Sequence, residues 1–355
     1  MRISSFLTKK FLKSLFFPAH NRGAALPKKL VKLLKNPPGY WDLPELPEIG
    51  SPISQSGLIA KSQRELSEKF GAKGCFFGVN GASGLIQSAV IAMANPGETI
   101  LMPRNVHISV IKICAMQNIL PIFFDLEFSP ETGHYKPLTK VWLEKVFEKL
   151  NFKENKIVGV ILVSPSYHGY AGDLEPLIDL CHQKDLPVLV DEAHGSYLLF
   201  CENLDLPKSA LSSNADLVVH SLHKSLNGLT QTAALWYKGN LVNEHNLIRS
   251  INLLQTTSPS SLLLSSCEES IKDWLNKKSL SIYQKRILEA KRIYKKLLQK
   301  NIPLIETQDP LKIVLNTSKA GIDGFTADKF FYRNGLIAEL PEMMSLTFCL
   351  GFANQ

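Results

Sequence analysis

The stretch ADLVVHSLHK, residues 215–224, is the most informative part of this chain. Its apolar and β-branched residues predict a buried strand, and its polar end delivers Lys224 into a loop. A second apolar run, Leu186 to Val190, ends in Asp191-Glu-Ala-His-Gly195. Two buried strands with polar residues at their carboxyl ends are typical of α/β folds, which place their sites at that edge of the sheet.

The same rhythm of strand, loop and helix extends over much of the chain. Helices are expected at 55–70, 83–94, 107–117, 138–150 and 174–184, and strands at 74–79, 99–102, 121–124 and 157–163. This alternation predicts a three-layer α/β/α fold with a mostly parallel sheet. Beyond about residue 240 a long helix at 279–300 and short strands at 312–315 and 345–350 predict a smaller C-terminal α+β domain.

Three segments follow from this pattern. Residues 1–55 are expected to be an N-terminal arm with an extended leading segment, 56–250 the large domain, and 251–355 a helical linker with a shortened small domain. Met1 to Phe17 is basic and apolar at helix-like spacing. Because lysines interrupt its apolar residues, an arm packed on the body or on a partner subunit is favoured over a targeting or membrane-surface segment.

Composition narrows the class of protein. The 355 residues are 45% hydrophobic and 20% charged, as in ordinary globular proteins. The net charge is +8, but no basic stripe alternates with aromatic residues, so a solvated basic face is favoured over nucleic-acid binding. Six cysteines without a CxxC pair favour a reducing compartment, the cytoplasm. No apolar run is long enough to span a bilayer, so no membrane partner is expected.

Several polar residues are candidates for chemistry at the sheet edge. A desolvated Lys224 could form a Schiff base with an aldehyde cofactor, although a solvated surface lysine is the alternative. Asp191 could hold a proton on a heteroaromatic ring nitrogen or simply cap the next helix. His194 could orient Asp191 or pack beside it. His107 could stack on a flat cofactor or bond locally at a helix start.

The turn GVNGASG, residues 78–84, joins a predicted strand to a predicted helix. Ala82, Ser83 and Gly84 would present N–H groups and a hydroxyl to an anion, and a single phosphate suits this turn better than a dinucleotide. The alternative is a glycine turn with Ser83 as the helix cap.

Other site classes fail on spacing. No GxSxG elbow is present, the DEAH string has no upstream P-loop, and the histidines at 182, 194, 220 and 223 lack a set of further ligands, so no metal is expected.

Taken in order, the motifs resemble those of fold-type I pyridoxal-phosphate enzymes, and more narrowly the ornithine/lysine/arginine decarboxylase major-domain family. The matching strings are PAHNRG near residue 18, FGVNGASG, PRNVHIS, SPSYHGYAGDL, VLVDEAHG, VHSLHKSLNGLTQ and LQTTSPSS. They extend over roughly residues 18–350.

The resemblance implies a role for each matching residue. Lys224 would bind pyridoxal 5'-phosphate covalently, Asp191 would pair with its ring nitrogen, His107 would stack on the ring, and His194 would orient substrate or Asp191. The phosphate would be held by Ala82, Ser83, Gly84, Ser221 and His223, with Thr257 or Ser258 reaching the phosphate of a neighbouring subunit. A homodimer, or a multiple of dimers, is therefore expected.

The implied activity is decarboxylation of a basic amino acid: lysine, arginine or ornithine. Ala82 departs from the family, which commonly has a hydroxyl residue there, and the chain is expected to lack the domains that flank the major domain in longer members. Glu339 is a candidate acid for a cationic side chain. An aminotransferase or aldolase is the alternative within the fold, with Arg333 available for a carboxylate; an inactive structural subunit is the alternative outside catalysis.

Overall fold

The structure is a computed structural model that describes residues 13–152, 154–201 and 203–353. The expected amphipathic arm falls mostly on residues 1–12 and so lies outside the described residues. Lys13–Ser14 form strand β1, which pairs in parallel with β13 (Leu336–Ile337). The leading segment contains helix α2 (Lys28–Leu34) and a 3-10 turn, η1 (Pro38–Tyr40), where the sequence suggested extended chain.

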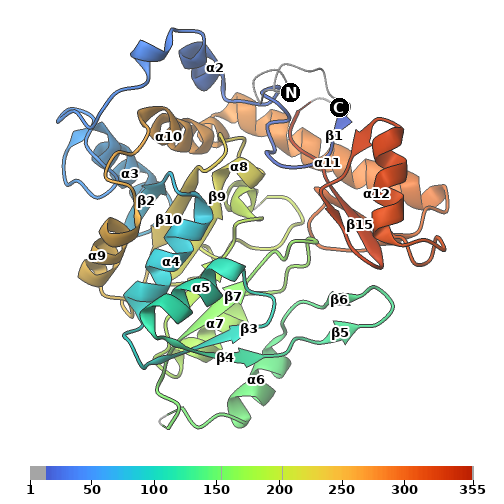
Figure 1. Cartoon of the computed structure of the whole chain (residues 1–355), viewed down its shortest axis with the longest axis horizontal. Coiled ribbons are helices and arrows are strands. Elements are labelled where there is room, and N and C mark those ends of the chain that lie inside the picture. The colour runs from blue at the N-terminus through green and yellow to red at the C-terminus, as the bar shows by residue number, and fades with distance from the viewer. Residues whose placement is uncertain (1–12, 153, 202, 354–355) are drawn as a thin grey trace.

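A seven-stranded sheet forms the centre of the large part of the molecule (Figure 1). Its strands, in spatial order, are β2 (Gly74–Gly78), β10 (Ala233–Tyr237), β9 (Leu217–Ser221), β8 (Val188–Asp191), β7 (Ile157–Val163), β3 (Thr99–Pro103) and β4 (Leu120–Phe124). All neighbouring strands are parallel except around β10, which runs antiparallel to both β2 and β9. The expected mostly parallel sheet is therefore confirmed.

Helices cover both faces of this sheet. Successive side chains of each strand point to opposite faces and so pack against different helices. Val188 and Val190 pack into one apolar cluster, and Leu189 between them packs into the other. The cluster that contains Leu189 includes residues of α4 (Gly81–Met93), α5 (Ile108–Gln117) and α9 (Glu244–Leu254). The cluster that contains Val188 and Val190 includes residues of α3 (Gly57–Lys69), α6 (Lys140–Glu148), α7 (Glu175–His182) and α10 (Ser261–Leu275). A strand covered on both faces needs apolar residues at every position, which is why polar and apolar residues do not alternate along these strands.

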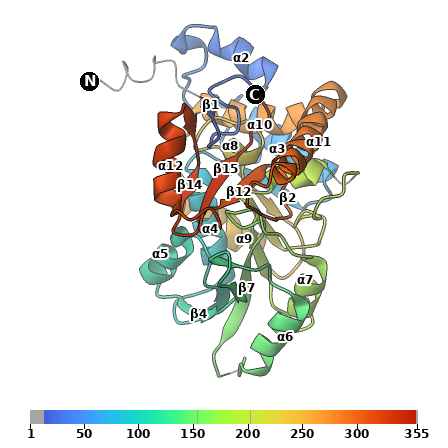
Figure 2. The same ribbon diagram turned by 90° about the vertical axis from the view of Figure 1, so that its right-hand side faces the viewer.

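The C-terminal part contains a second, antiparallel sheet of four strands. Their spatial order is β11 (Leu304–Ile305), β12 (Lys312–Asn316), β15 (Ser345–Cys349) and β14 (Leu340–Pro341). Helix α11 (Lys277–Gln299) precedes the sheet, and α12 (Gly324–Arg333) packs on it; Figure 2 shows this sheet and α12 facing the viewer. The predicted α+β unit is thus present, while the boundaries at residues 55 and 250 stay predictions.

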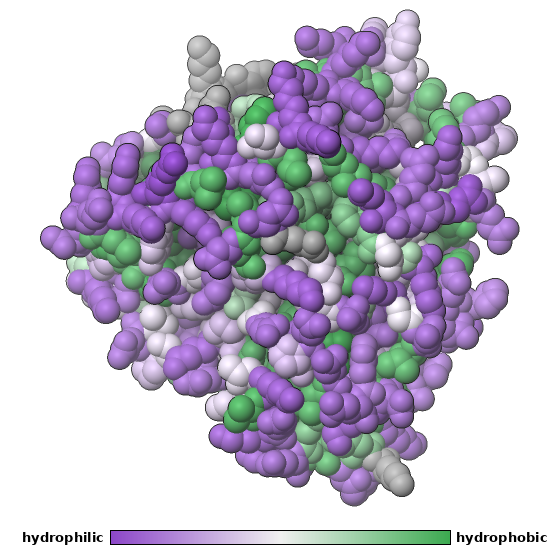
Figure 3. Space-filling view, turned by 180° about the vertical axis from the view of Figure 1, so that it is seen from behind, coloured by the Kyte–Doolittle hydropathy of each residue, from purple (hydrophilic) through white to green (hydrophobic). Residues whose placement is uncertain are grey.

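A hairpin of β5 (Phe128–Ser129) and β6 (His134–Tyr135) extends from the large sheet toward the small one (Figure 1). Within the described ranges, no helix combines the length and apolar character that a bilayer crossing needs. The surface seen in Figure 3 is mostly hydrophilic, with apolar groups exposed in small patches between charged side chains. All six cysteines are buried free thiols.

Strand register brings the polar strand ends to one edge of the large sheet. Ala233 of β10 lies opposite both Gly78 of β2 and Ser221 of β9. Asp191 ends β8 and pairs with Val163, the last residue of β7. The turn after β2, the end of β8 and the loop after β9 therefore meet at one place.

Candidate active site

Lys224 lies in a single helical turn, α8 (Leu222–Ser225), directly after β9. Its Nζ is 3.1 Å from Nε2 of His194, which follows β8. Burial lowers the pKa of Lys224; the carboxylate of Asp191 opposes this shift, and the charge of Lys312 adds to it. Burial also holds the pKa of His194 well below its usual range, and the charge of Lys224 pushes it the same way. Two groups whose pKa values are both lowered by burial thus face each other.

Asp191 is buried at the end of β8, and its Oδ1 accepts a hydrogen bond from the backbone N–H of Ala193 at 3.1 Å. Burial raises its pKa, while that hydrogen bond and the charge of Lys224 lower it. This hydrogen bond lies in the turn before the next helical element, η2 (Ser196–Phe200), whose N-cap is Gly195, so Asp191 does not cap that helix. Its proximity to the charge of Lys224 nevertheless places it in the same site.

His107 is the N-cap of α5. Its Nδ1 accepts from the backbone N–H of Ser109 at 3.2 Å and lies 2.8 Å from the Ser109 hydroxyl oxygen. A backbone N–H only donates, so Nδ1 carries no proton and a neutral ring is protonated at Nε2. Burial lowers the pKa of His107, and Asp191 opposes that shift. The local capping role is thus present, and the charge coupling to Asp191 joins this ring to the site.

Helix α4 begins at the end of the β2 turn, with Asn80 as its N-cap residue. Ala82 and Gly84 are buried and Ser83 is half-buried in its first turn. A Cβ on Gly84 would lie 3.0 Å from Nε2 of Gln255, a buried nitrogen without a hydrogen-bond partner among the described residues. The backbone N–H groups in the first turn of this 13-residue helix, together with the amide nitrogen of Gln255, are therefore suited to bind an anion.

Ser221 and His223 flank the same edge. The hydroxyl of Ser221 lies 3.2 Å from Nδ1 of His223, and burial lowers the pKa of His223 to about 4. Thr257 and Ser258 are exposed in the loop between α9 and α10, and Gln255 lies at the start of this loop. Arg333 is exposed at the end of α12. The structure therefore gathers Lys224, His194 and Asp191 closely, and it leaves Thr257, Ser258 and Arg333 at the surface.

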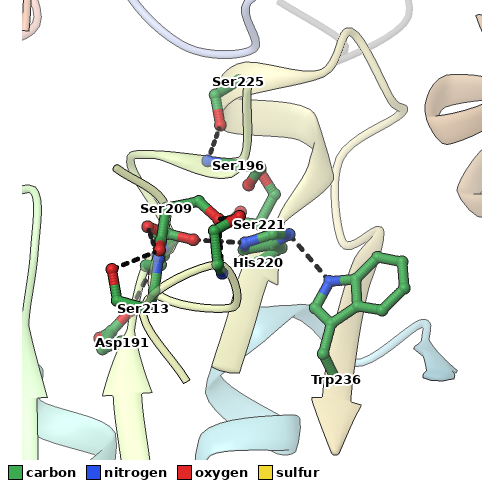
Figure 4. A network of polar contacts seen from close by, with 12 residues as sticks. Asp191, Ser196, Ser209, Ser213, His220, Ser221, Ser225 and Trp236 are labelled. Atoms are coloured by element: carbon green, nitrogen blue, oxygen red, sulfur yellow. Dashed lines mark hydrogen bonds and ion pairs between the residues drawn. The ribbon is translucent and has the colours of Figure 1, made fainter. Parts of the chain in front are cut away.

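A buried hydrogen-bond network supports the strand ends, and sequence reasoning missed it. Nε2 of His220 lies 2.7 Å from Oε2 of Glu192. Nδ1 of the same ring accepts a hydrogen bond from the indole N–H of Trp236 at 2.9 Å. Figure 4 shows His220 with Trp236 on one side and the Ser196–Ser225 contact nearby. The indole only donates, so Nδ1 is unprotonated and Nε2 donates to the carboxylate. This network joins β8, β9 and β10 directly behind Lys224.

Four further residues close the other side of the site. The ring of Phe17 lies 5.5 Å from that of His194, and the ring of Tyr167 lies 4.6 Å from it. Glu339 accepts hydrogen bonds from the Tyr167 hydroxyl and, at 2.9 Å, from the backbone N–H of Phe17. The ammonium of Lys312 lies 4.3 Å from the centre of the Phe17 ring. Of these, the sequence had pointed to Glu339 and, within the SPSYHG string, to Tyr167; Phe17, directly before the PAHNRG string, and Lys312 were missed.

His134, His168 and Glu342 form a separate cluster where the β5–β6 hairpin meets the small sheet. Nε2 of His168 lies 2.6 Å, and that of His134 3.4 Å, from Oε2 of Glu342. Their potential ligand atoms lie within 4.8 Å of one another. The two rings are stacked, however, with centres 3.8 Å apart and planes 19° apart. Imidazoles bound to one ion direct their in-plane lone pairs at the same point, which stacked rings do not do. We interpret the cluster as a hydrogen-bonded contact between the two parts of the fold.

A parallel sheet whose carboxyl edge holds a buried lysine beside a carboxylate and an imidazole defines an α/β enzyme with an amine-bearing site. The chain belongs to the family described as Orn/Lys/Arg decarboxylase, major domain, which matches residues 13–308. It is 31% identical over 354 residues to an arginine decarboxylase of Bacillus anthracis, a match that covers 95% of this chain and 69% of that relative. The family predicted from the motifs is confirmed.

Solved structures share the fold at low identity. The E. coli constitutive lysine decarboxylase superposes with a TM-score of 0.74 at 18% identity, over 87% of this chain and 50% of that chain. A serine palmitoyltransferase of S. paucimobilis with bound PLP superposes with a TM-score of 0.70 at 14% identity, over 97% and 83%. The chain thus spans about half the length of the lysine decarboxylase. The predicted fold class is confirmed.

Proposed function

We propose that this protein is a pyridoxal-phosphate-dependent decarboxylase of a basic amino acid. The observation that carries the proposal is the partly buried amine of Lys224, 3.1 Å from His194, with a lowered pKa and a carboxylate, Asp191, at the same sheet edge. A lowered pKa makes the neutral amine, the nucleophile that an aldehyde needs, more accessible. The arginine decarboxylase relative makes arginine the first substrate to test, before lysine and ornithine.

The residues present fit the cofactor. The first turn of α4, with Ala82, Ser83 and Gly84, would hold the phosphate together with Ser221 and His223, and Ala82 would contribute its backbone N–H alone. Asp191 would keep the ring nitrogen protonated, and His107 would lie on the ring face. Nδ1 of His194 is buried without a partner among the described residues, so a bound polar group would satisfy it.

When bound, the cofactor would supply an electron sink for the pair left on the α-carbon after carbon dioxide departs. The chain would supply the rest. Lys224 would hold the cofactor and then move a proton near the α-carbon, with His194 as its neighbour for proton exchange. Phe17 and Tyr167 would exclude water from the same side. Glu339, hydrogen-bonded to both segments, would place a carboxylate near the cationic end of the substrate.

We propose further that two subunits form the active unit, with Ser258 of each subunit reaching the phosphate of the other. The exposed position of Thr257 and Ser258 in the loop near α4 supports this assignment. A cytoplasmic location is consistent with six buried free thiols.

Trapping the cofactor tests the proposal. Wild-type protein incubated with pyridoxal phosphate should gain a visible absorption band and, after borohydride reduction, a stable mass adduct. Lys224→Ala should lose the adduct, whereas Lys238→Ala, a partly buried lysine that donates to the carbonyl of Leu211, should keep it. The loaded wild type should release carbon dioxide and the matching amine in equal amounts from arginine, lysine or ornithine. A wild type without adduct, or amine without carbon dioxide, would contradict the proposal.

A further inference from the structure

Lys312, the first residue of β12, is a buried cation at the junction of the two sheets. The residue is 4% exposed. Its ammonium lies 4.3 Å from the centre of the Phe17 ring and donates to Sγ of Cys349 at 3.3 Å. Among the described residues it takes part in no ion pair within 4.0 Å, unlike the surface lysines paired with carboxylates elsewhere.

Two acids near this charge are Cys349 and Asp309, and Lys312 lowers the pKa of both against the larger effect of their burial. Burial raises the pKa of the Cys349 thiol to about 11, although Lys312 opposes the shift, so the sulfur stays a neutral thiol near pH 7. Asp309 uses Oδ1 to accept from the hydroxyl of Tyr197 at 2.7 Å and from the backbone N–H of Leu311 at 2.9 Å. Burying an ammonium is costly, and with no carboxylate of the described residues in direct contact Lys312 can still gain from an anion that binds beside it.

The Phe17 ring links this ammonium to the site built around Lys224. The same Phe17 ring that lies under Lys312 is 6.0 Å from Nζ of Lys224 and 5.5 Å from the His194 ring. The charges of both lysines depress the pKa of His194, after the larger effect of its burial. Lys312 therefore belongs to the electrostatic environment in which a substrate amine would replace that of Lys224.

The position of Lys312 is built into the fold. The loop 164–170 passes over its stem at Gly169, which has a φ of +97°. A Cβ on Gly169 would lie 2.9 Å from Cγ of Lys312 and 2.9 Å from Cβ of Asp309. Only a glycine accommodates both the backbone conformation and this close approach, so the side chain is held against the loop rather than free in solvent.

We propose that Lys312 binds the α-carboxylate of the amino-acid substrate, the group lost as carbon dioxide. The inference rests on the proposed function, because the anion is identified by where the substrate amine must sit. An α-amino acid carries a carboxylate one carbon away from its amine, and the amine product does not. The ion pair therefore forms with substrate and disappears with the reaction, when the bond to the carboxyl carbon breaks, its electron pair stays on the α-carbon and a proton takes the place of carbon dioxide.

This arrangement gives the site a way to distinguish substrate from product. Substrate gains a charge-assisted hydrogen bond in a dry place, where such bonds are strongest. The amine product has no carboxylate to pair with the Lys312 ammonium, and this loss of the ion pair favours release of the product. The same cation should contribute to binding more than to the chemical step, because the negative charge leaves the carboxylate as the bond breaks.

The test compares ligands with and without the carboxylate on the loaded protein. Absorption changes of the bound cofactor would report binding of arginine methyl ester and of agmatine, the decarboxylated amine, and steady-state kinetics would give KM and kcat for arginine. Lys312→Met should raise KM for arginine by about 10- to 100-fold, the range of one charge-assisted hydrogen bond, with a smaller change in kcat. Binding of the ester and of agmatine should stay within about twofold. Lys312→Arg should recover part of the loss, and Lys238→Met should match wild type.

The outcomes separate this inference from the proposed function. If Lys312→Met weakens arginine, ester and agmatine equally, or loses the cofactor band that wild type has, Lys312 does not read the carboxylate and the inference is wrong. Unchanged KM in Lys312→Met with a normal band overturns it as well. If wild type itself binds no cofactor, the proposed function fails first and the inference falls with it.

Discussion

Nζ of Lys224 lies 3.1 Å from Nε2 of His194, and burial lowers the pKa of both groups. Either nitrogen can donate to or accept from the other, so the two side chains are placed to exchange a proton directly. The pair comes from two strands, since His194 follows β8 and Lys224 follows β9.

Replacing Asp191 by asparagine tests the acid of the site. Asp191→Asn removes the negative charge that would keep the cofactor ring protonated, so kcat should fall by about 100- to 1000-fold. The borohydride adduct should remain, because Lys224 is intact and loses the carboxylate that raises its pKa. Steady-state rates and adduct mass measured together check this, and a variant with wild-type kcat would rule out the assigned role.

The buried network around His220 should support folding. Trp236→Phe removes the donor to Nδ1 of His220 and leaves that acceptor buried and unpaired, which should cost about 1–3 kcal/mol of unfolding free energy. Trp142→Phe is the matched control, because its indole donates to the carbonyl of Asp125 at the surface. Urea unfolding of both variants measures the difference. Equal losses in the two would contradict a special role for the buried contact.

Histidine burial should make the cofactor-free protein acid-sensitive. Burial lowers the pKa of His223 to about 4 from the usual 6.5, so between these values the unfolded chain binds a proton that the folded chain does not. The free energy of unfolding should therefore fall as the pH drops from about 6.5 to about 4, by about 3 kcal/mol for this residue.

His223→Gln should flatten part of that slope. The pKa values of buried His194 and of exposed His107 shift in the same direction, so the slope should not vanish. Urea midpoints of wild type and variant at several pH values give the comparison, and parallel slopes would show that His223 does not contribute.

Gly169 should be intolerant of a side chain because of what lies against it. Gly169→Ala adds a methyl group 2.9 Å from the Lys312 stem at a φ of +97°, and it should lower stability by about 1–3 kcal/mol while raising KM for the amino acid. Gly71→Ala has a positive φ of +63° but open space, so it should cost about 1 kcal/mol without a kinetic effect. Identical kinetics in the two variants would argue against a positioning role for the loop.

Glu342 should hold the small sheet to the large one. Burial pushes its pKa up, but hydrogen bonds from His134 and His168 and from Ser345 outweigh this and hold the pKa well below its usual range. Glu342→Gln should destabilise the fold by about 1 kcal/mol, since the carboxylate is partly exposed. Faster backbone hydrogen exchange in β14 and β15 of the variant would confirm that the contact stabilises this sheet. Unchanged exchange rates in these strands would contradict the prediction.

The family and the fold class were accessible from sequence, because both depend on local patterns. The run from Val188 to Val190 is apolar at every position, which indicates a strand covered on both faces, and helical spacing between such runs indicates parallel connections. Motifs after each strand predicted which side chains share the edge, since parallel strands end together. Lys224, Asp191 and His107 were found in this way.

Other features depended on contacts between distant segments. Strand β10 runs against its neighbours, and its apolar run looks like that of a parallel strand. The network of Glu192, His220 and Trp236 joins three strands at positions without a shared motif. Lys312 opens an ordinary strand of the small sheet, and no motif in the sequence marks it.

The sequence by itself determined the class of site, since the order of strand ends and turns is written along the chain. The tertiary structure alone decided the electrostatics of that site. Whether a lysine is solvated, paired or buried without a counter-ion depends on which surfaces close over it. For Lys312 those surfaces are Phe17, 295 positions earlier, and Gly169 of the loop after β7, and their packing removes the water that would otherwise screen its charge.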